Sequence, residues 1–226
     1  MLNFITGPLF VISLLVFVVG LLVRVILYVR GLDWRLERVA YKYHMDRSIP
    51  GALASIFKWL VPGGTTGWRV QPVAMTAFFL IHFGAIFVPL FVLGHTVLLE
   101  DVTGISLPAL PYALADLLTI ATMCGLALVV YRRLSSPVLR QLNSRSDWLV
   151  LLLTFLPFFT GFMAALGTSL YDMWIVLHVL TGEAFLILAP FTKLSHIALY
   201  FMSRGQLGMD YAIKRGGATR GGVFPW

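Results

Sequence analysis

The chain has 226 residues, of which 59% are hydrophobic and only 12% charged, and its mean hydropathy is +0.88. Soluble domains carry about 25% charged residues, so this composition excludes an ordinary soluble enzyme. The net charge of +7 by itself would suit a nucleic-acid-binding protein, but the placement of the basic residues predicts a membrane protein and no nucleic-acid partner. The single cysteine, Cys124, excludes an internal disulfide framework and a cysteine-ligated iron–sulfur cluster.

Hydrophobic segments long enough to cross a bilayer determine the predicted fold class. A helix needs roughly 20 apolar residues to span the ~30 Å hydrocarbon core. Segments of this kind occupy about 5–29, 73–98, 112–131, 148–168 and 173–202. We therefore predict an all-α, polytopic membrane protein, a bundle of five transmembrane helices in a membrane domain over 1–202, followed by a cytoplasmic tail over 203–226.

The distribution of charge predicts how these helices cross the membrane. All 17 Lys and Arg lie in 30–72, in 132–147, in the tail, or within a turn or two of that same side. The opposite side comprises the N-terminus, 99–111 and 169–172, which hold acidic residues and no basic ones. By the positive-inside rule the N-terminus is outside and the C-terminus inside in a multi-pass protein.

The segment 30–72 is expected to be more than a connector. Charged and apolar residues alternate over 33–45, and a short apolar cluster follows at 56–61. This pattern predicts a pair of interfacial helices on the cytoplasmic face, or alternatively a docking surface for a partner. Residues from Gly205 onward show no helical period, so we expect them to be extended on a partner or disordered.

Four of the five histidines lie in two predicted spans: His82 and His95 in the second, His178 and His196 in the fifth. On one continuous helix the residues from His178 to His196 make about five whole turns, so both imidazoles leave the same face roughly 27 Å apart. The rotation between His82 and His95 is about 220°, so these two share a face only if the helix kinks at Pro89.

This distribution predicts two haems, each held by one histidine from each span, because bis-histidine ligation needs one imidazole on either side of the porphyrin. The two spans run in opposite directions through the membrane. His82 is therefore level with His196 for an inner haem, and His95 is level with His178 for an outer one.

Two glycines, Gly84 and Gly94, stand beside the second-span ligands and would let a macrocycle approach the backbone. A bare metal ion is the alternative ligand for the histidines. It is less favoured because no Cys, Asp or Glu accompanies them at ligand spacing.

The residues around these histidines resemble those of a known family, the gamma subunit of respiratory nitrate reductase. The matching pieces are His178-Val-Leu-Thr-Gly182, Phe185-Leu186, Pro190-Phe191, Leu194 and His196-Ile197 in the fifth span, and Ile81-His82-Phe83-Gly84 and Gly94-His95 in the second. The resemblance implies a di-haem cytochrome b that anchors a redox complex and passes electrons across the membrane. It also implies that His82 and His196 ligate the inner haem b, and His95 and His178 the outer one.

The chain is also similar to the cytochrome b members of the high-molecular-weight cytochrome c complexes of sulfate-reducing bacteria. That resemblance implies a protein of the bacterial inner membrane, with a periplasmic multihaem cytochrome c, an integral membrane quinone-interacting subunit and cytoplasmic iron–sulfur proteins as partners. Membrane lipid and menaquinone are the further expected partners.

The chain departs from the nitrate reductase pattern at three places. About three extra residues separate His82 from His95, and 96–111 contains no Lys, so quinol oxidation at the outer face has no matching residue. Glu183 is a carboxylate deep in the fifth span, to be explained either as a neutralised or hydrogen-bonded buried group or as a proton relay or haem-propionate neighbour.

The function that the sequence predicts is electron transfer between a periplasmic donor, cytochrome c or quinol, and cytoplasmic iron–sulfur proteins through two b-type haems. The chain would be a subunit of an oxidoreductase complex and not a self-standing enzyme. The alternative is a haem-free membrane scaffold, or a proton-conducting subunit in which the histidines and Glu183 serve proton movement.

Overall fold

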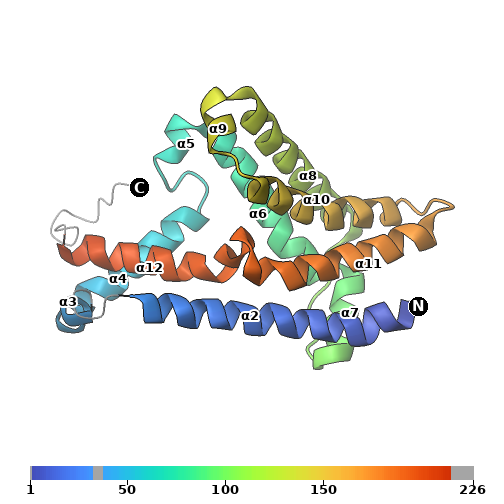
Figure 1. The fold of residues 1–226 in the computed structure, drawn as a ribbon, viewed down its shortest axis with the longest axis horizontal. Coiled ribbons are helices and arrows are strands. Elements are labelled where there is room, and N and C mark those ends of the chain that lie inside the picture. Colours follow the sequence, from blue (N-terminus) through green and yellow to red (C-terminus); the bar gives the residue numbers. More distant parts are fainter. Residues whose placement is uncertain (1, 33–37, 215–226) are drawn as a thin grey trace. The chain divides into compact units, whose positions relative to one another are not determined.

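A computed structural model describes residues 2–32 and 38–214, and within those ranges the chain is helical with no β-strand (Figure 1). Five helical stretches are long and apolar enough to cross a membrane, which confirms the predicted fold class. These stretches are Ile5–Gly31, Pro72–Phe91, Tyr112–Ser135, Arg145–Ala165 and Tyr171–Phe191. The first stretch consists of the π-helical turn η1 (Ile5–Leu9) and the helix α2 (Phe10–Gly31), and the short helix α1 (Leu2–Phe4) precedes it.

The chain forms two compact units, each described here by itself. The first comprises Met1–Val18 and Val73–Lys193, and the second comprises Val19–Pro72 and Leu194–Trp226. The helices of the first unit, after η1 and the start of α2, are α6 (Pro72–Phe91), α7 (Leu93–Thr103), α8 (Tyr112–Ser135), α9 (Pro137–Leu142), α10 (Arg145–Ala165), α11 (Tyr171–Leu188) and the 3₁₀ turn η2 (Ala189–Phe191).

Helices α10 and α11 form an antiparallel hairpin that is the centre of the first unit (Figure 1). The turn between them passes through Gly167, whose φ of +61° lies in the left-handed region that glycine adopts without strain. The helices α10 and α8 are also in contact. Their buried positions are rich in threonine, which bonds its own helix backbone: Thr154 donates to Val150 O (2.8 Å) and Thr119 to Ala115 O (2.8 Å).

Small residues bring α6 against α8. A Cβ added at Gly84 would lie only 1.6 Å from Thr122 Oγ1, and one added at Gly125 would lie 3.0 Å from Ala77 O. The Thr122 hydroxyl donates to Leu118 O (2.7 Å) on its own helix. This close packing of backbones is the usual way in which membrane helices associate, since lipid offers no hydrophobic driving force between them.

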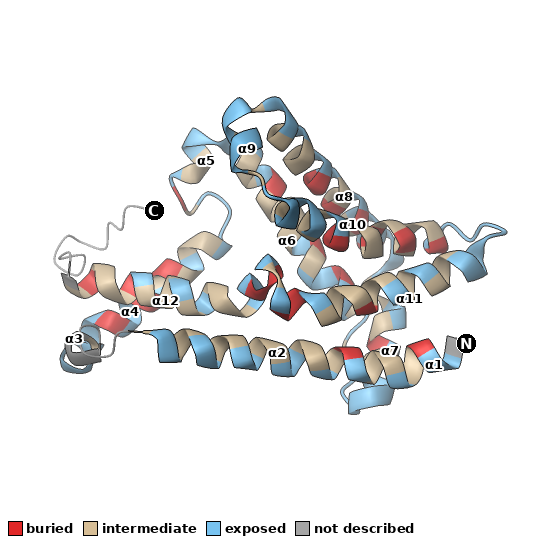
Figure 2. Ribbon diagram, viewed as in Figure 1, coloured by how far each residue is buried: buried red, intermediate tan, exposed pale blue. Residues whose placement is uncertain are grey.

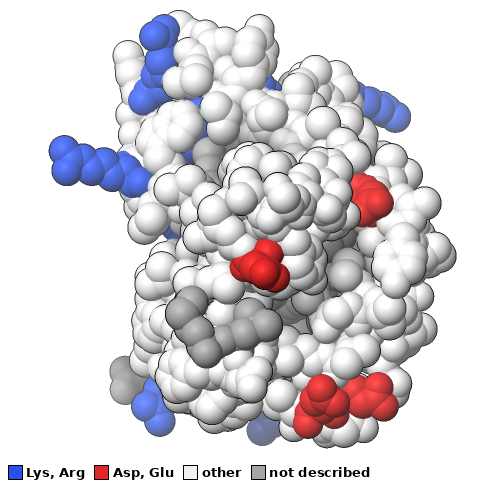
Figure 3. Space-filling model, turned by 90° about the vertical axis from the view of Figure 1, so that its right-hand side faces the viewer, with Lys and Arg blue, Asp and Glu red and all other residues white. Residues whose placement is uncertain are grey.

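Few large apolar side chains on the spans are buried, as expected of helices surrounded by lipid or by partner subunits, and buried residues are a minority on these helices in Figure 2. In the first span only Ile5 and Ser13 are buried, and the Ser13 hydroxyl donates to Leu9 O (2.8 Å). The acidic residues expected at the outer side, Glu100, Asp101 and Asp172, are exposed. Figure 3 shows acidic side chains on a largely uncharged face.

The second unit contains the 30–72 segment and the chain after Leu194. Its helices, besides the second part of α2, are α3 (Arg38–Tyr43), α4 (Met45–Leu60), α5 (Gly67–Val70), the 3₁₀ turn η3 (Lys193–Ser195, whose first residue belongs to the first unit) and α12 (His196–Lys214). Helix α4 lies in the segment predicted to hold interfacial helices. Part of the predicted 33–45 helix, residues 33–37, lies outside the described residues.

Helix α4 packs against α12 through glycines at the contact. A Cβ at Gly51 would lie 2.5 Å from Gly208 O, and one at Gly208 would lie 2.2 Å from Gly51 O. Tyr41 donates its hydroxyl to Asp210 Oδ1 (2.5 Å) and Tyr200 to Ile56 O (2.9 Å). The expectation that the chain loses helical structure from Gly205 is therefore wrong over 205–214, because the contact with α4 stabilises a helix that its glycines alone disfavour.

Both predicted histidine-bearing spans are interrupted between their histidines. The second is not one helix over 73–98: α6 ends at Phe91, Val92 is extended (φ −69°, ψ 135°), and α7 begins at Leu93. The fifth ends as an α-helix at Leu188 and continues through η2, an extended Thr192 and η3 before α12.

Each interruption lies beside or contains a proline, which lacks the N–H needed for the helix ladder. Pro89 lies three residues before Val92, and the buried Pro190 lies within η2. The prediction that His178 and His196 leave one face of a continuous helix is therefore wrong, because the helix is broken between them.

Candidate functional site

The structure brings together His95 of α7 and His178 of α11, the two residues predicted to form the outer pair. Their Nε2 atoms are 3.3 Å apart, and their rings are nearly parallel, with an interplanar angle of 10°. The ring centroids are 5.6 Å apart, much farther than the nitrogens. The two Nε2 atoms therefore lie between the rings and point at each other, as two axial ligands of one atom do.

The break after α6 is what aims His95 at its partner. The new helix begins with the N–H groups of His95 and Thr96 donating to Val92 O, at 2.9 and 3.0 Å. The carbonyl of Phe91, left at the end of α6, accepts from the Leu110 N–H at 2.7 Å. Because these backbone groups are satisfied within the chain, the break is tolerated at membrane depth. The rotation of about 220° expected between His82 and His95 on an ideal helix thus does not limit the pair.

A backbone carbonyl orients His178 from the neighbouring helix. Its Nδ1 is 2.9 Å from Pro157 O on α10. A carbonyl oxygen can only accept, so Nδ1 carries the proton and donates. In neutral imidazole this leaves Nε2 with its lone pair, the state in which histidine binds metals.

His95 has a similar, weaker anchor. Its Nδ1 is 3.4 Å from Val88 O, near the end of α6. With both Nδ1 atoms donating, both Nε2 atoms present lone pairs to each other across 3.3 Å, and two neutral rings in these tautomers cannot hydrogen-bond. A cation between the nitrogens, either a shared proton or a metal ion, resolves this repulsion.

The separation fits such an ion after a small opening. A metal–imidazole bond is about 2.0–2.1 Å long, so one metal between the rings would hold the two nitrogens about 4 Å apart, roughly 0.8 Å more than they are. The structure has no cluster of three or more His, Cys, Asp or Glu residues able to hold a metal within its described residues. Two imidazoles do not complete a zinc site, whereas a haem brings its own equatorial nitrogens and needs only two axial ligands. The residues present thus suit haem better than a bare ion.

Gly161 on α10 creates the room for the His178 ring, and the sequence analysis did not single it out. A Cβ there would lie 2.8 Å from His178 Cε1 and 2.9 Å from Nδ1, closer than real contacts allow. Next to it, the hydroxyl oxygens of Thr160 on α10 and Thr181 on α11 are 3.2 Å apart and share a hydrogen bond between the two helices. The sequence signal for Gly161 is an isolated glycine in the interior of a predicted helix, which often indicates that another group packs closely against the helix backbone.

The predicted inner pair is divided between the units: His82 lies in α6 of the first, and His196 begins α12 of the second. Their pairing stays a prediction. His82 nevertheless shows the same ligand-ready tautomer, because its Nδ1 is 2.6 Å from Phe78 O, one turn back on its own helix. His196 is exposed.

The two glycines predicted to admit a macrocycle differ. Gly84 is buried where α8 packs, and the space beside it is filled by Thr122, so a packing role accounts for it. Gly94, next to His95, has no atom within 4 Å of an added Cβ, so open space does lie beside the outer ligand.

Glu183 on α11 is 4% exposed, and neither of its carboxyl oxygens has a hydrogen-bond partner within the part of the chain that the structure describes. An unpaired polar group of this kind is costly and calls for an explanation. Among the described residues the carboxyl is therefore not hydrogen-bonded, which leaves a neutralised buried group, a proton relay or a haem-propionate neighbour as its explanations.

Comparison with known proteins shows one informative likeness. No family model matches the chain, and no solved structure matches it. A protein of Nitratidesulfovibrio vulgaris strain Hildenborough, named only "Protein", is 58% identical over 223 residues, which cover 99% of both chains. The chain belongs to the same family as this N. vulgaris protein.

Proposed function

We propose that the chain is the membrane-anchoring cytochrome b subunit of a respiratory redox complex in a bacterial inner membrane. It would transfer electrons across the membrane between a periplasmic donor, a multihaem cytochrome c or quinol, and cytoplasmic iron–sulfur partners, with an integral quinone-interacting subunit beside it. The observation that carries the proposal is the opposed pair His95 and His178, whose Nε2 atoms face each other 3.3 Å apart between nearly parallel rings.

The chain's own residues would hold two haems b. His95 and His178 ligate the outer one, and His82 and His196 the inner one. Bound haem supplies a one-electron Fe(III)/Fe(II) couple. The carbonyls of Pro157 and Val88 fix the tautomer and orientation of the outer ligands, a role that outer-shell hydrogen bonds commonly have at metal sites.

Haem content measured on single variants tests this proposal. Wild-type protein purified in detergent should show reduced b-type absorption bands and two haems per chain. His178→Ala and His95→Ala should each lower the ratio toward one by removing the outer haem, and His82→Ala should do so by removing the inner one. His44→Ala is the matched control, because His44 is exposed in the second unit, before α4, and should leave the ratio at two.

Either of two results would overturn the proposal. The wild-type protein could contain no extractable haem, or the two outer-pair variants could leave the haem ratio and spectrum unchanged. The second result would make His95 and His178 a half-buried polar pair with no ligand role.

A haem-free, proton-conducting subunit is the second candidate, favoured by the buried carboxyl of Glu183 and its lack of a hydrogen-bond partner among the described residues. It predicts that Glu183→Gln lowers proton flux into proteoliposomes that contain the purified complex. It also predicts that His178→Ala leaves assembly and colour unchanged. Loss of haem from His178→Ala would rule this candidate out.

A further inference from the structure

A basic cavity lies in the first unit where three spans end, away from the histidine pair. Its volume is about 310 Å³, roughly ten times the ~30 Å³ that one water molecule occupies in the liquid. Three cations line it: Arg132 and Arg133 in the last turn of α8, and Lys193 after α11. The one carboxylate in the lining is Asp147, so the walls carry a net charge of +2.

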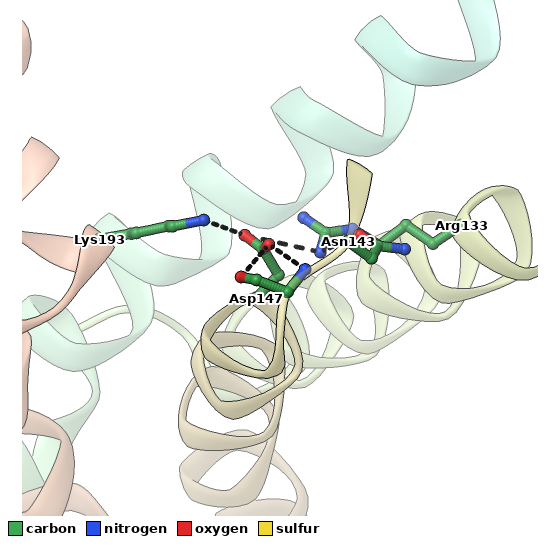
Figure 4. A network of polar contacts seen from close by, with 5 residues as sticks. Arg133, Asn143, Asp147 and Lys193 are labelled. Carbon is green, nitrogen blue, oxygen red and sulfur yellow. Dashed lines mark hydrogen bonds and ion pairs between the residues drawn. The ribbon is translucent and has the colours of Figure 1, made fainter. Parts of the chain in front are cut away.

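Asp147 is itself fully engaged, as Figure 4 shows. Its Oδ1 accepts from Lys193 Nζ at 2.7 Å and lies 3.9 Å from Arg133 Nη1, while its Oδ2 accepts from the Ser144 hydroxyl and N–H at 2.7 and 2.9 Å. The carboxylate thereby caps the start of α10 and offsets one of the cations. The excess charge that remains in the cavity comes from the arginines of α8.

Asn143 adds a neutral donor to the same wall. Its Oδ1 accepts from Arg133 Nη1 at 2.9 Å, which fixes the direction of the amide. Its Nδ2 is buried and has no partner within the described residues. A buried donor without an acceptor is rare and costs about 1–3 kcal/mol, so this atom suits an acceptor supplied by a ligand.

The rest of the lining is apolar, formed by Val129, Leu139 and Leu142. The cavity thus has a cationic, hydrogen-bonding part beside an aliphatic part. It stands at the ends of the membrane spans α8 and α10, where the polar groups of the bilayer begin. Basic pockets between transmembrane helices at this depth are suited to anionic lipid head groups.

We propose that this cavity binds the phosphate of an anionic phospholipid, with Arg132 and Arg133 supplying charge and Asn143 Nδ2 supplying a hydrogen bond. The aliphatic side chains accommodate the adjoining glycerol and first acyl carbons. A zwitterionic lipid carries a compensating ammonium group and fits a cavity of net positive charge less well. This site is independent of haem binding, so its test does not depend on the proposed function.

The test uses the full chain, purified in detergent and stripped of lipid. Phosphatidylglycerol, phosphatidylcholine and inorganic phosphate are added separately. Binding is followed by the rise in thermal unfolding midpoint and by native mass spectrometry of the retained lipid. We expect phosphatidylglycerol to bind and to stabilise the protein, and phosphatidylcholine to do neither at the same concentration.

Two variants probe the lining. Arg132→Gln removes one charge and should weaken phosphatidylglycerol binding about fivefold. Asn143→Asp is nearly isosteric and keeps the acceptor for Arg133, so the fold is retained while the buried donor becomes a repelling oxygen; we expect a loss of at least the same size. Arg140→Gln is the matched control, because Arg140 is an exposed arginine of α9 outside the cavity lining, and its binding should stay within twofold of wild type.

Several outcomes would overturn the assignment. Equal binding of phosphatidylcholine, or an equal loss in Arg140→Gln, would show diffuse attraction to the basic surface. Stabilisation by inorganic phosphate as large as that by the lipid would make the ligand a free phosphate. If Arg132→Gln fails to fold, Asn143→Asp decides alone, and unchanged binding by that variant contradicts the proposal.

Discussion

The substitution Gly161→Ala is the most direct test of how the His178 ligand is held. The new Cβ would lie 2.8 Å from His178 Cε1, whereas carbon atoms in favourable contact are about 3.5–4.0 Å apart. The ring must therefore retreat by roughly 0.7 Å, or α10 and α11 must separate by a similar distance. Either movement lengthens the bond from Nδ1 to Pro157 O beyond hydrogen-bonding range, from its present 2.9 Å.

Loss of this hydrogen bond affects the ligand more than the fold. A hydrogen bond contributes about 0.5–1.5 kcal/mol to stability, which a membrane bundle tolerates. At metal sites, however, removing an outer-shell partner of a ligating histidine typically lowers metal affinity by about 10- to 100-fold. We therefore expect Gly161→Ala to accumulate in the membrane at near wild-type levels with a weakened or empty outer haem site.

The assay is the ratio of haem to protein together with a potentiometric titration of the b-type bands. Wild type should give two haems in two redox transitions, and Gly161→Ala should lose or shift one of them. Gly182→Ala is the control, because an added Cβ on that α11 glycine meets no atom within 4 Å. A Gly161→Ala protein with two haems and unchanged potentials would refute the reasoning that Gly161 positions His178.

Three further predictions concern stability, measured in detergent by thermal unfolding or, for the contact between α4 and α12, by protease resistance. Asp147→Ala removes the cap of α10 and should destabilise by about 1–2 kcal/mol, whereas Lys193→Ala should change little because that side chain is 59% exposed; equal effects would contradict this account. Gly208→Val should separate α4 from α12 and expose the C-terminal helix to protease, while Gly205→Ala, whose Cβ would be 3.9 Å from its nearest neighbour, should remain protected. Glu183→Met should leave the midpoint unchanged or raise it, since the carboxyl lacks a hydrogen-bond partner among the described residues; a clear fall would show that the carboxyl has a stabilising partner in the assembled protein.

The number and approximate positions of the membrane spans could be predicted from the apolar runs in the sequence. Apolar runs of about 20 residues must form helices in lipid, because each backbone N–H and C=O needs an internal partner there. All five predicted spans begin within three residues of the observed helical stretches, and the first and third begin at the same residues, Ile5 and Tyr112. Orientation follows from charge and stays a prediction.

The histidine geometry was only partly accessible. Ideal helical rotation favoured the fifth-span histidines and disfavoured the second-span pair, since it assumed that each helix continues between its two histidines. The structure interrupts both, at Val92 and around Pro190, and so changes the direction of every residue beyond the break. A proline shows that a helix is weakened nearby, but neighbouring packing decides at which residue it ends and in which direction it resumes.

By itself, the sequence determined that this is a five-span helical membrane protein and which four histidines are candidate ligands. Tertiary structure alone decided that His95 and His178 meet nitrogen to nitrogen, that Gly161 makes room for the second ring, and that residues 205–214 are helical against α4. The physical reason is the sequence distance over which each property is determined. Hydropathy and charge are properties of neighbouring residues along the chain. Ring orientation and close helix contact depend on atoms of other helices, far away in sequence.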